Sequence, residues 1–175
     1  MLETTLGYLE KDGQWLMLHR TKKKKDINKD KWIGIGGKLE AGETPAQCMV
    51  RECLEETGLT WHEPELKAAI TFSSLDTSSN ELTEEIMYLF SGKSFSGQLK
   101  ECDEGELCWV DKEKVFALPS WEGDALFLSL LMQNAPYFTM ELKYADGKLI
   151  KASLNDKLLD EQERERIRSA AFSYL

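Results

Sequence analysis

The sequence has few residues of the kinds that build zinc sites or disulfide frameworks. Only two histidines occur, His19 and His62, and neither lies near a pair of cysteines. The cysteines show no CxxC spacing, which structural zinc sites usually contain; they are Cys48, Cys53, Cys102 and Cys108. We therefore expect no zinc centre, and we expect reduced thiols of the kind found in cytoplasmic proteins.

Long apolar runs are also missing. No stretch approaches the roughly 18 consecutive apolar residues that a membrane helix requires. The N-terminal residues MLETTLGYLEKDGQ lack the basic region and the apolar region of a signal peptide. The sequence therefore predicts no membrane partner and a cytoplasmic location.

Positive charge is in deficit, because the formal net charge is −9. Such a balance disfavours proteins that bind long nucleic acids or membrane surfaces without specificity. A small phosphorylated substrate is still compatible, since a bound metal ion reverses the sign of the charge locally. With 175 residues, of which 42% are hydrophobic, the chain can bury one sizeable core. Both a monomer and a homodimer agree with this composition.

The most patterned stretch runs from Gly36 to Leu59 and predicts a capped helix. Thr44 can cap the N-terminus of the helix, and Gln47, three residues later, can complete a capping box. Pro45 fits the first helical position, where its missing N–H costs nothing. Gly58 is a natural C-terminal stop.

Helical spacing divides this segment into two faces. The predicted packing face contains Ala46, Met49, Val50, Cys53 and Thr57. The opposite face gathers three carboxylates, which are Glu52, Glu55 and Glu56. A hard divalent cation such as Mg²⁺ or Mn²⁺ would relieve their repulsion, because it takes oxygen ligands and usually keeps waters and substrate phosphates. The alternative is a solvated acidic face on which Arg51 is an internal ion-pair partner.

The complete spacing follows the pattern G-x5-E-x7-R-E-U-x-E-E-x-G-U, in which U is an apolar residue. The fixed positions are Gly37, Glu43, Arg51, Glu52, Glu55, Glu56, Gly58 and Leu59. By this motif the chain resembles the Nudix (MutT-like) hydrolases. Cys53 stands where that family usually has a larger aliphatic residue, and this departure concerns packing only.

The resemblance implies cleavage of a pyrophosphate bond in a nucleoside diphosphate derivative. Magnesium, or manganese as a substitute, would be held by Glu52, Glu55, Glu56 and the Gly36 carbonyl. The metal would bridge phosphate oxygens and lower the pKa of an attacking water. Arg51 would orient the glutamates, since its planar fork suits carboxylates, and Glu43 would brace the loop.

Glu104 is the candidate for a fourth carboxylate, remote from the helix in sequence. Members related to MutT carry a glutamate five residues ahead of a tryptophan, which is Trp109 here. The resemblance therefore implies that Glu104 binds metal or acts as the general base. The alternative is a surface glutamate, because the loop also contains Glu101, Asp103 and Glu106.

Two stretches, residues 32–38 and residues 118–124, resemble the branch that hydrolyses oxidised purine nucleoside triphosphates such as 8-oxo-dGTP. One includes Gly37 and Lys38, which are candidates for substrate binding. In the other, Trp121 matches a tryptophan that stacks on the purine, and Asp124 matches the second of two acids that read the base edge. Asp124, if protonated, would donate to a purine carbonyl. The alternative for Trp121 is a core residue at the start of a helix.

This chain departs from that branch at two positions. Gly123 stands in the place of the first acid, and Ile33 stands where the branch often has an asparagine. Bacterial members of the MutX type resemble the chain up to about residue 155, including these departures.

Three functions follow from these observations. The first is a Mg²⁺-dependent pyrophosphohydrolase that converts oxidised purine nucleoside triphosphates to the monophosphate and pyrophosphate, a role in nucleotide-pool sanitation and DNA repair. The second is hydrolysis of another diphosphate, such as a dinucleoside polyphosphate, a pterin triphosphate or an RNA 5′ end. The third is a sensor that binds nucleotides without turnover.

The remaining pattern predicts an α+β protein, and the resemblance implies a Nudix fold with a mixed β-sheet sandwiched between α-helices. We expect a Nudix hydrolase domain over residues 1–155 and an amphipathic helix over residues 156–175, packed on the same domain or on a partner subunit. Further helices are predicted at 111–116 and 121–132, and polar loops at 22–31 and 73–84. Strands are predicted at residues 2–9, 14–20, 32–37, 66–73, 85–90, 105–110, 137–144 and 148–153.

Overall fold

The structure is a computed structural model that describes residues 1–174, and the chain forms two compact units. The motif unit comprises residues 5–66 and 90–120. The C-terminal unit comprises residues 1–4, 67–89 and the chain from residue 121 onward. This division differs from the predicted one at residue 155, and the predicted domain boundary stays a prediction. In the described part of the chain, no helix has the length and apolar character needed to span a bilayer.

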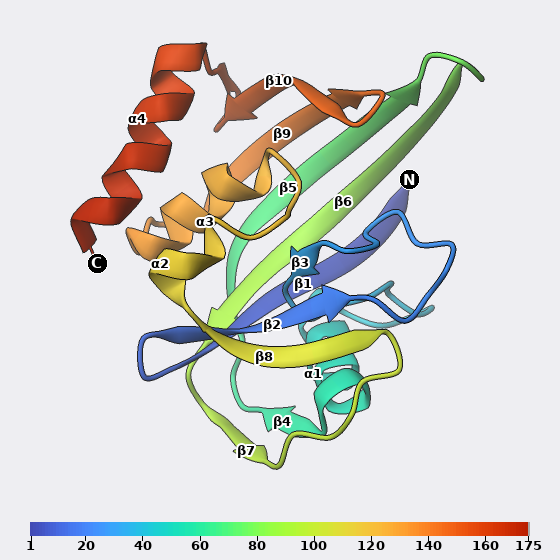
Figure 1. Cartoon of the computed structure of the whole chain (residues 1–175), viewed down its shortest axis with the longest axis vertical. Helices are drawn as coiled ribbons and strands as arrows, with labels where there is room; N and C mark the ends of the chain where they lie inside the picture. Colours follow the sequence, from blue (N-terminus) through green and yellow to red (C-terminus); the bar gives the residue numbers. More distant parts are fainter. Residues whose placement is uncertain (175) are drawn as a thin grey trace. The chain divides into compact units, whose positions relative to one another are not determined.

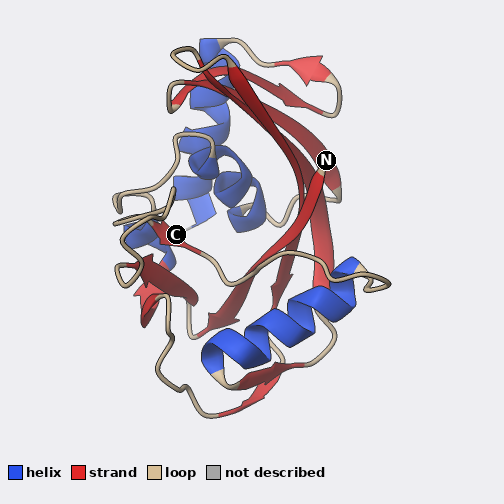
Figure 2. Ribbon diagram, turned by 90° about the vertical axis from the view of Figure 1, so that its right-hand side faces the viewer, coloured by secondary structure: helices blue, strands red, loops and turns tan. Residues whose placement is uncertain are grey.

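The motif unit is built mainly of antiparallel strands around one long helix. Strand β2 pairs antiparallel with β1, β3 and β8, and β4 pairs with β7 as a separate ribbon beside α1 (Figure 2). Its elements are β1 (Leu2–Lys11), β2 (Gln14–Arg20), β3 (Trp32–Ile33), α1 (Pro45–Thr57), β4 (Leu59–Trp61), β7 (Phe95–Gly97), β8 (Gly105–Asp111) and α2 (Lys112–Val115). The part of β1 before residue 5 belongs to the other unit.

Helix α1 has the caps that its sequence predicts. The Thr44 hydroxyl accepts a hydrogen bond from the Gln47 amide at 3.2 Å, and the Gln47 side chain accepts one from the Thr44 amide at 2.9 Å. Pro45 is the first helical residue, and Gly58 ends the helix in the left-handed conformation with a φ of 78°. The predicted capping box and stop are therefore confirmed.

The buried face of α1 was predicted only in part. Met49, Cys53 and Thr57 are buried as expected, but Ala46 is exposed, and the neighbouring Cys48 is fully buried in its place. The Cys48 thiol lies against the Thr5 hydroxyl and the Gly37 carbonyl. Periodicity did not identify this contact, because the partner segments are distant in sequence.

The strand predicted over residues 32–37 is shorter in the structure. Only Trp32 and Ile33 pair with β2, after which Ile35 forms an isolated bridge with Gly7. A Cβ atom on Gly36 would collide with the Thr5 carbonyl oxygen. The segment therefore leaves regular pairing where glycine lets two backbones approach closely.

The C-terminal unit contains a mixed sheet, which confirms the α+β class with a mixed sheet and helices. Strand β9 pairs antiparallel with β10 and parallel with β5, and β6 follows β5 in the strand order (Figure 1). Its elements are β5 (Glu65–Asp76), β6 (Glu81–Gly92), α3 (Asp124–Met132), β9 (Phe138–Ala145), β10 (Lys148–Leu154), β11 (Lys157–Leu158), α4 (Glu161–Ala171) and a 3-10 turn (Phe172–Tyr174). Of β5 and β6, only residues 67–89 belong to this unit.

The prediction of a polar loop over residues 73–84 is wrong. Strands β5 and β6 continue through most of this segment, and only residues 77–80 form the turn between them. The backbone of β5 pairs with β9 as far as Leu75, and Asp146 accepts hydrogen bonds from Thr77 at the turn. The strands are therefore extended by ladder pairing that polar side chains do not reveal.

Two helices begin later than predicted. Helix α3 starts at Asp124, so Trp121 lies in the turn before it. Helix α4 starts at Glu161, where Asp160 and Glu163 form a capping box. Asn155 and Asp156 have positive φ angles of 47° and 65°, which turn the chain into β11 instead of a helix.

Helices α3 and α4 contact each other within the C-terminal unit (Figure 1). The Gln133 side-chain amide, just after α3, donates to the Ile167 carbonyl of α4 at 3.4 Å. Leu175, the last residue of the predicted helix, lies outside the described residues. Helix α4 therefore packs on α3 of its own unit.

We predict that Gly58→Ala destabilises the protein more than Gly13→Ala. Both glycines have a positive φ, of 78° and 75°, so alanine at either site costs roughly 1–2 kcal/mol in backbone strain. At Gly58 a Cβ atom would also lie 2.8 Å from the Gln98 carbonyl oxygen, whereas at Gly13 no described atom lies within 4 Å. Urea unfolding of both variants measures the difference, and equal losses of stability would contradict the steric account.

Candidate active site

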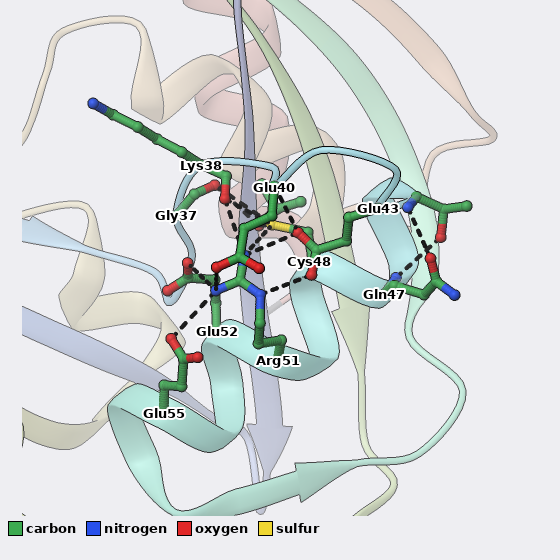
Figure 3. A network of polar contacts seen from close by, with 11 residues as sticks. Gly37, Lys38, Glu40, Glu43, Gln47, Cys48, Arg51, Glu52 and Glu55 are labelled. Carbon is green, nitrogen blue, oxygen red and sulfur yellow. Dashed lines mark hydrogen bonds and ion pairs between the residues drawn. The ribbon is translucent and has the colours of Figure 1, made fainter.

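Arg51 is the centre of a polar network between α1 and the loop that carries Gly37 and Lys38 (Figure 3). Its Nε and Nη2 atoms donate to the two oxygens of Glu43 at 2.7 and 2.9 Å, a bidentate pair. Its Nη1 atom donates to Glu52 at 2.7 Å and to Glu55 at 3.2 Å. The Arg51 guanidinium lowers the pKa of Glu43 to about 2, helped by the Glu40 amide. One cation therefore fixes three carboxylates of the motif.

Backbone from the glycine turn approaches these carboxylates closely. The Lys38 carbonyl accepts from Arg51 Nη2 at 3.0 Å. A Cβ atom on Gly37 would collide with the Glu52 carboxyl group, so glycine is required there. The Gly36 amide donates to Glu56 at 3.4 Å. The Lys38 ammonium group points away from the network (Figure 3).

Glu56 is a carboxyl group in an unfavourable environment for charge. Burial raises its pKa to about 8, with further contributions from the charges of Glu104 and Glu52, while the Gly36 amide and Arg20 oppose the shift. The pKa of Glu52 is also raised, first by burial and then by Glu55 and Glu104, against the effect of Arg51. The charge of Glu104 therefore acts on two carboxyl groups of α1, those of Glu52 and Glu56.

Glu104 lies in this group and is held by two cations. Arg20 Nη1 and Lys23 Nζ each form an ion pair with one oxygen of Glu104, the latter at 2.5 Å. Arg20 also pairs with Asp26 at 2.7 Å. The Glu104 side chain is 23% exposed, and its charge acts on Glu52 and Glu56. This favours the metal or base role over the alternative of a surface glutamate in an acidic loop, and both stay predictions.

Sequence reasoning missed Arg20. It ends β2 directly opposite Gly105 of β8, so the pairing of these two strands brings it to the residue after Glu104. Only correct pairing of β2 with β8 would have revealed this position. The polar loop that follows is also more fixed than expected of a solvated loop, since Lys22 Nζ donates to the Cys102 carbonyl at 2.6 Å.

The acidic group fits a divalent cation by its chemistry. Within residues 1–174, no three carboxylate, cysteine or histidine side chains are already arranged as a ligand set. Arg51 binds Glu52, and Arg20 and Lys23 bind Glu104, so arginine and lysine now neutralise part of the charge. A cation of higher charge density would relieve the repulsion recorded in the raised pKa values. The metal-ligand roles of Gly36, Glu52, Glu55, Glu56 and Glu104 stay predictions.

The two residues predicted to bind the base belong to the C-terminal unit. Trp121 is partly exposed, and its ring forms a T-shaped pair with the ring of Tyr144, with centroids 5.5 Å apart and an interplanar angle of 74°. Asp124 is the first residue of α3 and is only 6% exposed. The structure therefore brings Trp121 and Asp124 into one turn, and their role in substrate binding stays a prediction.

The chain matches the family model of the NUDIX domain over residues 5–131. A protein of Bacillus subtilis described as an uncharacterized Nudix hydrolase is 36% identical over 104 residues, which are 59% of this chain and 65% of that protein. The oxidized purine nucleoside triphosphate hydrolase of Danio rerio is 33% identical over 112 residues, which are 64% of this chain and 69% of that protein. The chain thus spans just under two thirds of the first relative's length.

Among solved structures, a MutT protein from Bacillus halodurans is similar over most of its length. Its TM-score is 0.79 with 26% identity, and the match covers 90% of this chain and 99% of that chain. The family resemblance that the motif predicts is therefore confirmed by sequence and by fold.

We predict that the metal-free protein loses stability as pH rises from 4.5 to 8. In that window Glu56 is protonated in the folded state, with a pKa of about 8, but ionised in the unfolded chain, where the pKa is near 4.5. The folded state then binds more protons, so the free energy of unfolding falls with pH, by roughly 2–5 kcal/mol in total. Urea unfolding at several pH values measures this slope.

Glu56→Gln is expected to remove most of that slope. Glu43→Gln is the matched control, because the lowered pKa of Glu43, about 2, places its own pH dependence below pH 4.5. A slope that persists unchanged in Glu56→Gln would show that burial of this carboxyl is not its cause.

Proposed function

This chain belongs to the Nudix hydrolase family, and from that premise we propose that it is a divalent-metal-dependent hydrolase of nucleoside triphosphates. The observation that carries the proposal is the group formed by Glu52, Glu56 and Glu104, whose charges oppose one another. A protein that only needed a stable helix would gain nothing from this arrangement. A phosphate-binding cation compensates for it.

Magnesium, with manganese as a substitute, would be held by Glu52, Glu55, Glu56, Glu104 and the Gly36 carbonyl. When bound, such a metal supplies charge neutralisation at the phosphates and a more acidic water. Arg51 keeps Glu52 and Glu55 in place through its hydrogen bonds. Gly37 leaves room for the Glu52 carboxyl.

A base role for Glu104 is proposed together with its role as a ligand. Both of its oxygens lie in ion pairs, one with Arg20 and one with Lys23. Lys23 is exposed, so this ion pair is weak and screened by salt. Release of Lys23 would leave one oxygen of Glu104 able to accept a proton from water while Arg20 still orients the group.

For the substrate we propose oxidised purine nucleoside triphosphates such as 8-oxo-dGTP, cleaved to the monophosphate and pyrophosphate. The similarity to the Danio rerio protein described as an oxidized purine nucleoside triphosphate hydrolase supports this choice. Trp121 offers a ring face for stacking, and Asp124 offers a carboxyl for the base edge. Gly37 and Lys38 would lie at the phosphates. The proposed role is nucleotide-pool sanitation in the cytoplasm, as a monomer or homodimer, without long nucleic acid as a partner.

The test is turnover of a nucleotide panel with Mg²⁺, with the products identified. Wild-type protein should release pyrophosphate from an oxidised purine triphosphate, and chelation of the metal should abolish this release. Glu52→Gln and Glu56→Gln should each lower kcat at least about 100-fold. Glu40→Gln is the control, because its side chain is 71% exposed and 3.9 Å from Arg51, and it should keep kcat within about twofold.

Two other results would replace the proposal. Binding of nucleotides without any turnover, by a folded protein saturated with Mg²⁺, would indicate a sensor. Full turnover by Glu56→Gln would remove the metal assignment.

We predict that Asp124→Asn changes the discrimination between 8-oxo-dGTP and dGTP by at least about tenfold. An amide of the same size places a donor where an ionised carboxyl has an acceptor oxygen, so it cannot make the same hydrogen bonds to a base edge. Asp124→Ala, measured beside it, also removes the hydrogen bonds of a protonated carboxyl. The measurement is the ratio of kcat/KM values for the two nucleotides. Glu165→Gln, an acid on α4 of the same unit whose side chain is 65% exposed, is the control, and a ratio unaltered in both Asp124→Asn and Asp124→Ala would refute the role.

A further inference from the structure

Tyr144, near the end of β9, is a tyrosine whose hydroxyl group is buried beside Trp121 and Asp124. The residue is only 5% exposed. Its ring contacts Phe72 of β5, with centroids 6.5 Å apart, and lies in a T-shaped arrangement with the ring of Trp121, with centroids 5.5 Å apart. A buried phenol needs a hydrogen-bond partner, so the position of its hydroxyl group is informative.

The Tyr144 hydroxyl accepts a hydrogen bond from the Gly123 amide at 2.9 Å. Gly123 immediately precedes α3, and this helix has no side-chain cap of its own. The turn is also tied at a second point, since Glu122 accepts from the Leu149 amide of β10 at 3.3 Å. Two side-chain contacts therefore hold the turn that carries Trp121 and Asp124 against the sheet of the C-terminal unit.

The same hydroxyl explains why glycine stands at position 123. A Cβ atom there would lie 2.6 Å from Tyr144 Oη and 2.7 Å from Leu142 Cδ1. The acid that the resembling branch carries at this position would therefore have to displace the side chains of Tyr144 and Leu142. The Tyr144 phenol occupies the space that the acid's first side-chain atom would need.

The phenol also keeps its proton. Burial, followed by the charge of Asp124, raises the pKa of Tyr144 further above its ordinary value near 10. The hydroxyl group therefore keeps a proton that it can donate while it accepts from the Gly123 amide, and the Asp124 carboxylate lies close enough to influence it. A change at this hydroxyl affects the turn at Gly123 and the neighbourhood of Asp124 together.

We propose that Tyr144 is a positioning residue of the nucleotide site, whose hydroxyl fixes the Gly123 backbone and thereby sets the Trp121 ring and the Asp124 carboxyl for the base. This inference rests on the proposed function, because it assumes that Trp121 and Asp124 contact a purine. It assigns no chemical step to Tyr144. It predicts an effect on nucleotide affinity and base selection, separate from the hydrolytic step.

The test is Tyr144→Phe, which keeps the ring and removes only the hydroxyl. The Gly123 amide is then buried without its partner, and we expect KM for the oxidised purine triphosphate to rise roughly tenfold while kcat stays within about twofold. The ratio of kcat/KM between 8-oxo-dGTP and dGTP should change, whereas affinity for free pyrophosphate should not. Unchanged KM, or a loss confined to kcat, would overturn the proposal.

Tyr88→Phe is the matched control. Its hydroxyl donates to Glu3 at 2.9 Å in a surface contact of the same unit, so the variant loses one phenolic hydrogen bond away from the turn. It should leave KM and base selection unchanged. Equal effects in both variants would show a merely structural role and overturn the proposal.

A measurement on the unaltered protein covers the case in which Tyr144→Phe does not fold. On saturation with 8-oxo-dGMP, the product of the proposed reaction, the amide resonance of Gly123 should shift and its hydrogen exchange should slow. An unaffected Gly123 amide in a nucleotide-saturated protein would overturn the role of Tyr144. Failure of the wild-type chain to bind any purine nucleotide would instead refute the proposed function.

Discussion

The structure depends on holding like charges close together. Glu52 and Glu56 lie on one face of α1, and Glu104 comes to them from the segment before β8. Burial and, after it, the charges of neighbouring glutamates raise the pKa values of Glu52 and Glu56. In a helix with no other task, exposed carboxylates would turn away into water. Here burial and neighbouring cations hold them in place, so the cost must be offset by something that the carboxylates bind.

Two arginines make this arrangement stable in the metal-free protein, and they do so differently. Arg51 belongs to α1 and donates hydrogen bonds from all three guanidinium nitrogens, pairing with both oxygens of Glu43 while also contacting Glu52. Arg20 ends a strand and joins Asp26 to Glu104. Each therefore neutralises part of the acidic group and fixes its geometry. A lysine would supply the charge at either site, but it lacks the planar guanidinium group whose N–H donors point in fixed directions.

The part of this site that the sequence predicts is the part that is local. Thr44, Gln47, Pro45 and Gly58 define α1 by contacts within a few residues, so spacing alone identifies them. The Arg20 contact with Glu104 joins residues 84 positions apart, and it exists only because β2 pairs with β8. Strand pairing is not encoded in any short pattern, which is why Arg20 was missed.

The wrong boundaries have the same origin. Residues 73–84 read as a loop because their side chains are polar, yet the backbone ladder with β9 continues to Leu75. The helix expected from residue 156 gives way to β11, because two residues in left-handed conformation form a tight turn first. The pattern of polar and apolar side chains predicts which residues of a segment are buried. It does not predict which backbone groups pair with another strand.

The turn at Gly123 shows how a departure from a family pattern can be a consequence of packing. The acid missing from this position could be read as a loss of base recognition. The structure instead places a buried phenol where the side chain would begin and bonds it to the Gly123 amide. Because a hydroxyl both donates and accepts, it can anchor the backbone and still respond to Asp124. A glycine and a tyrosine 21 residues apart therefore form one unit of structure, and neither can be interpreted without the other.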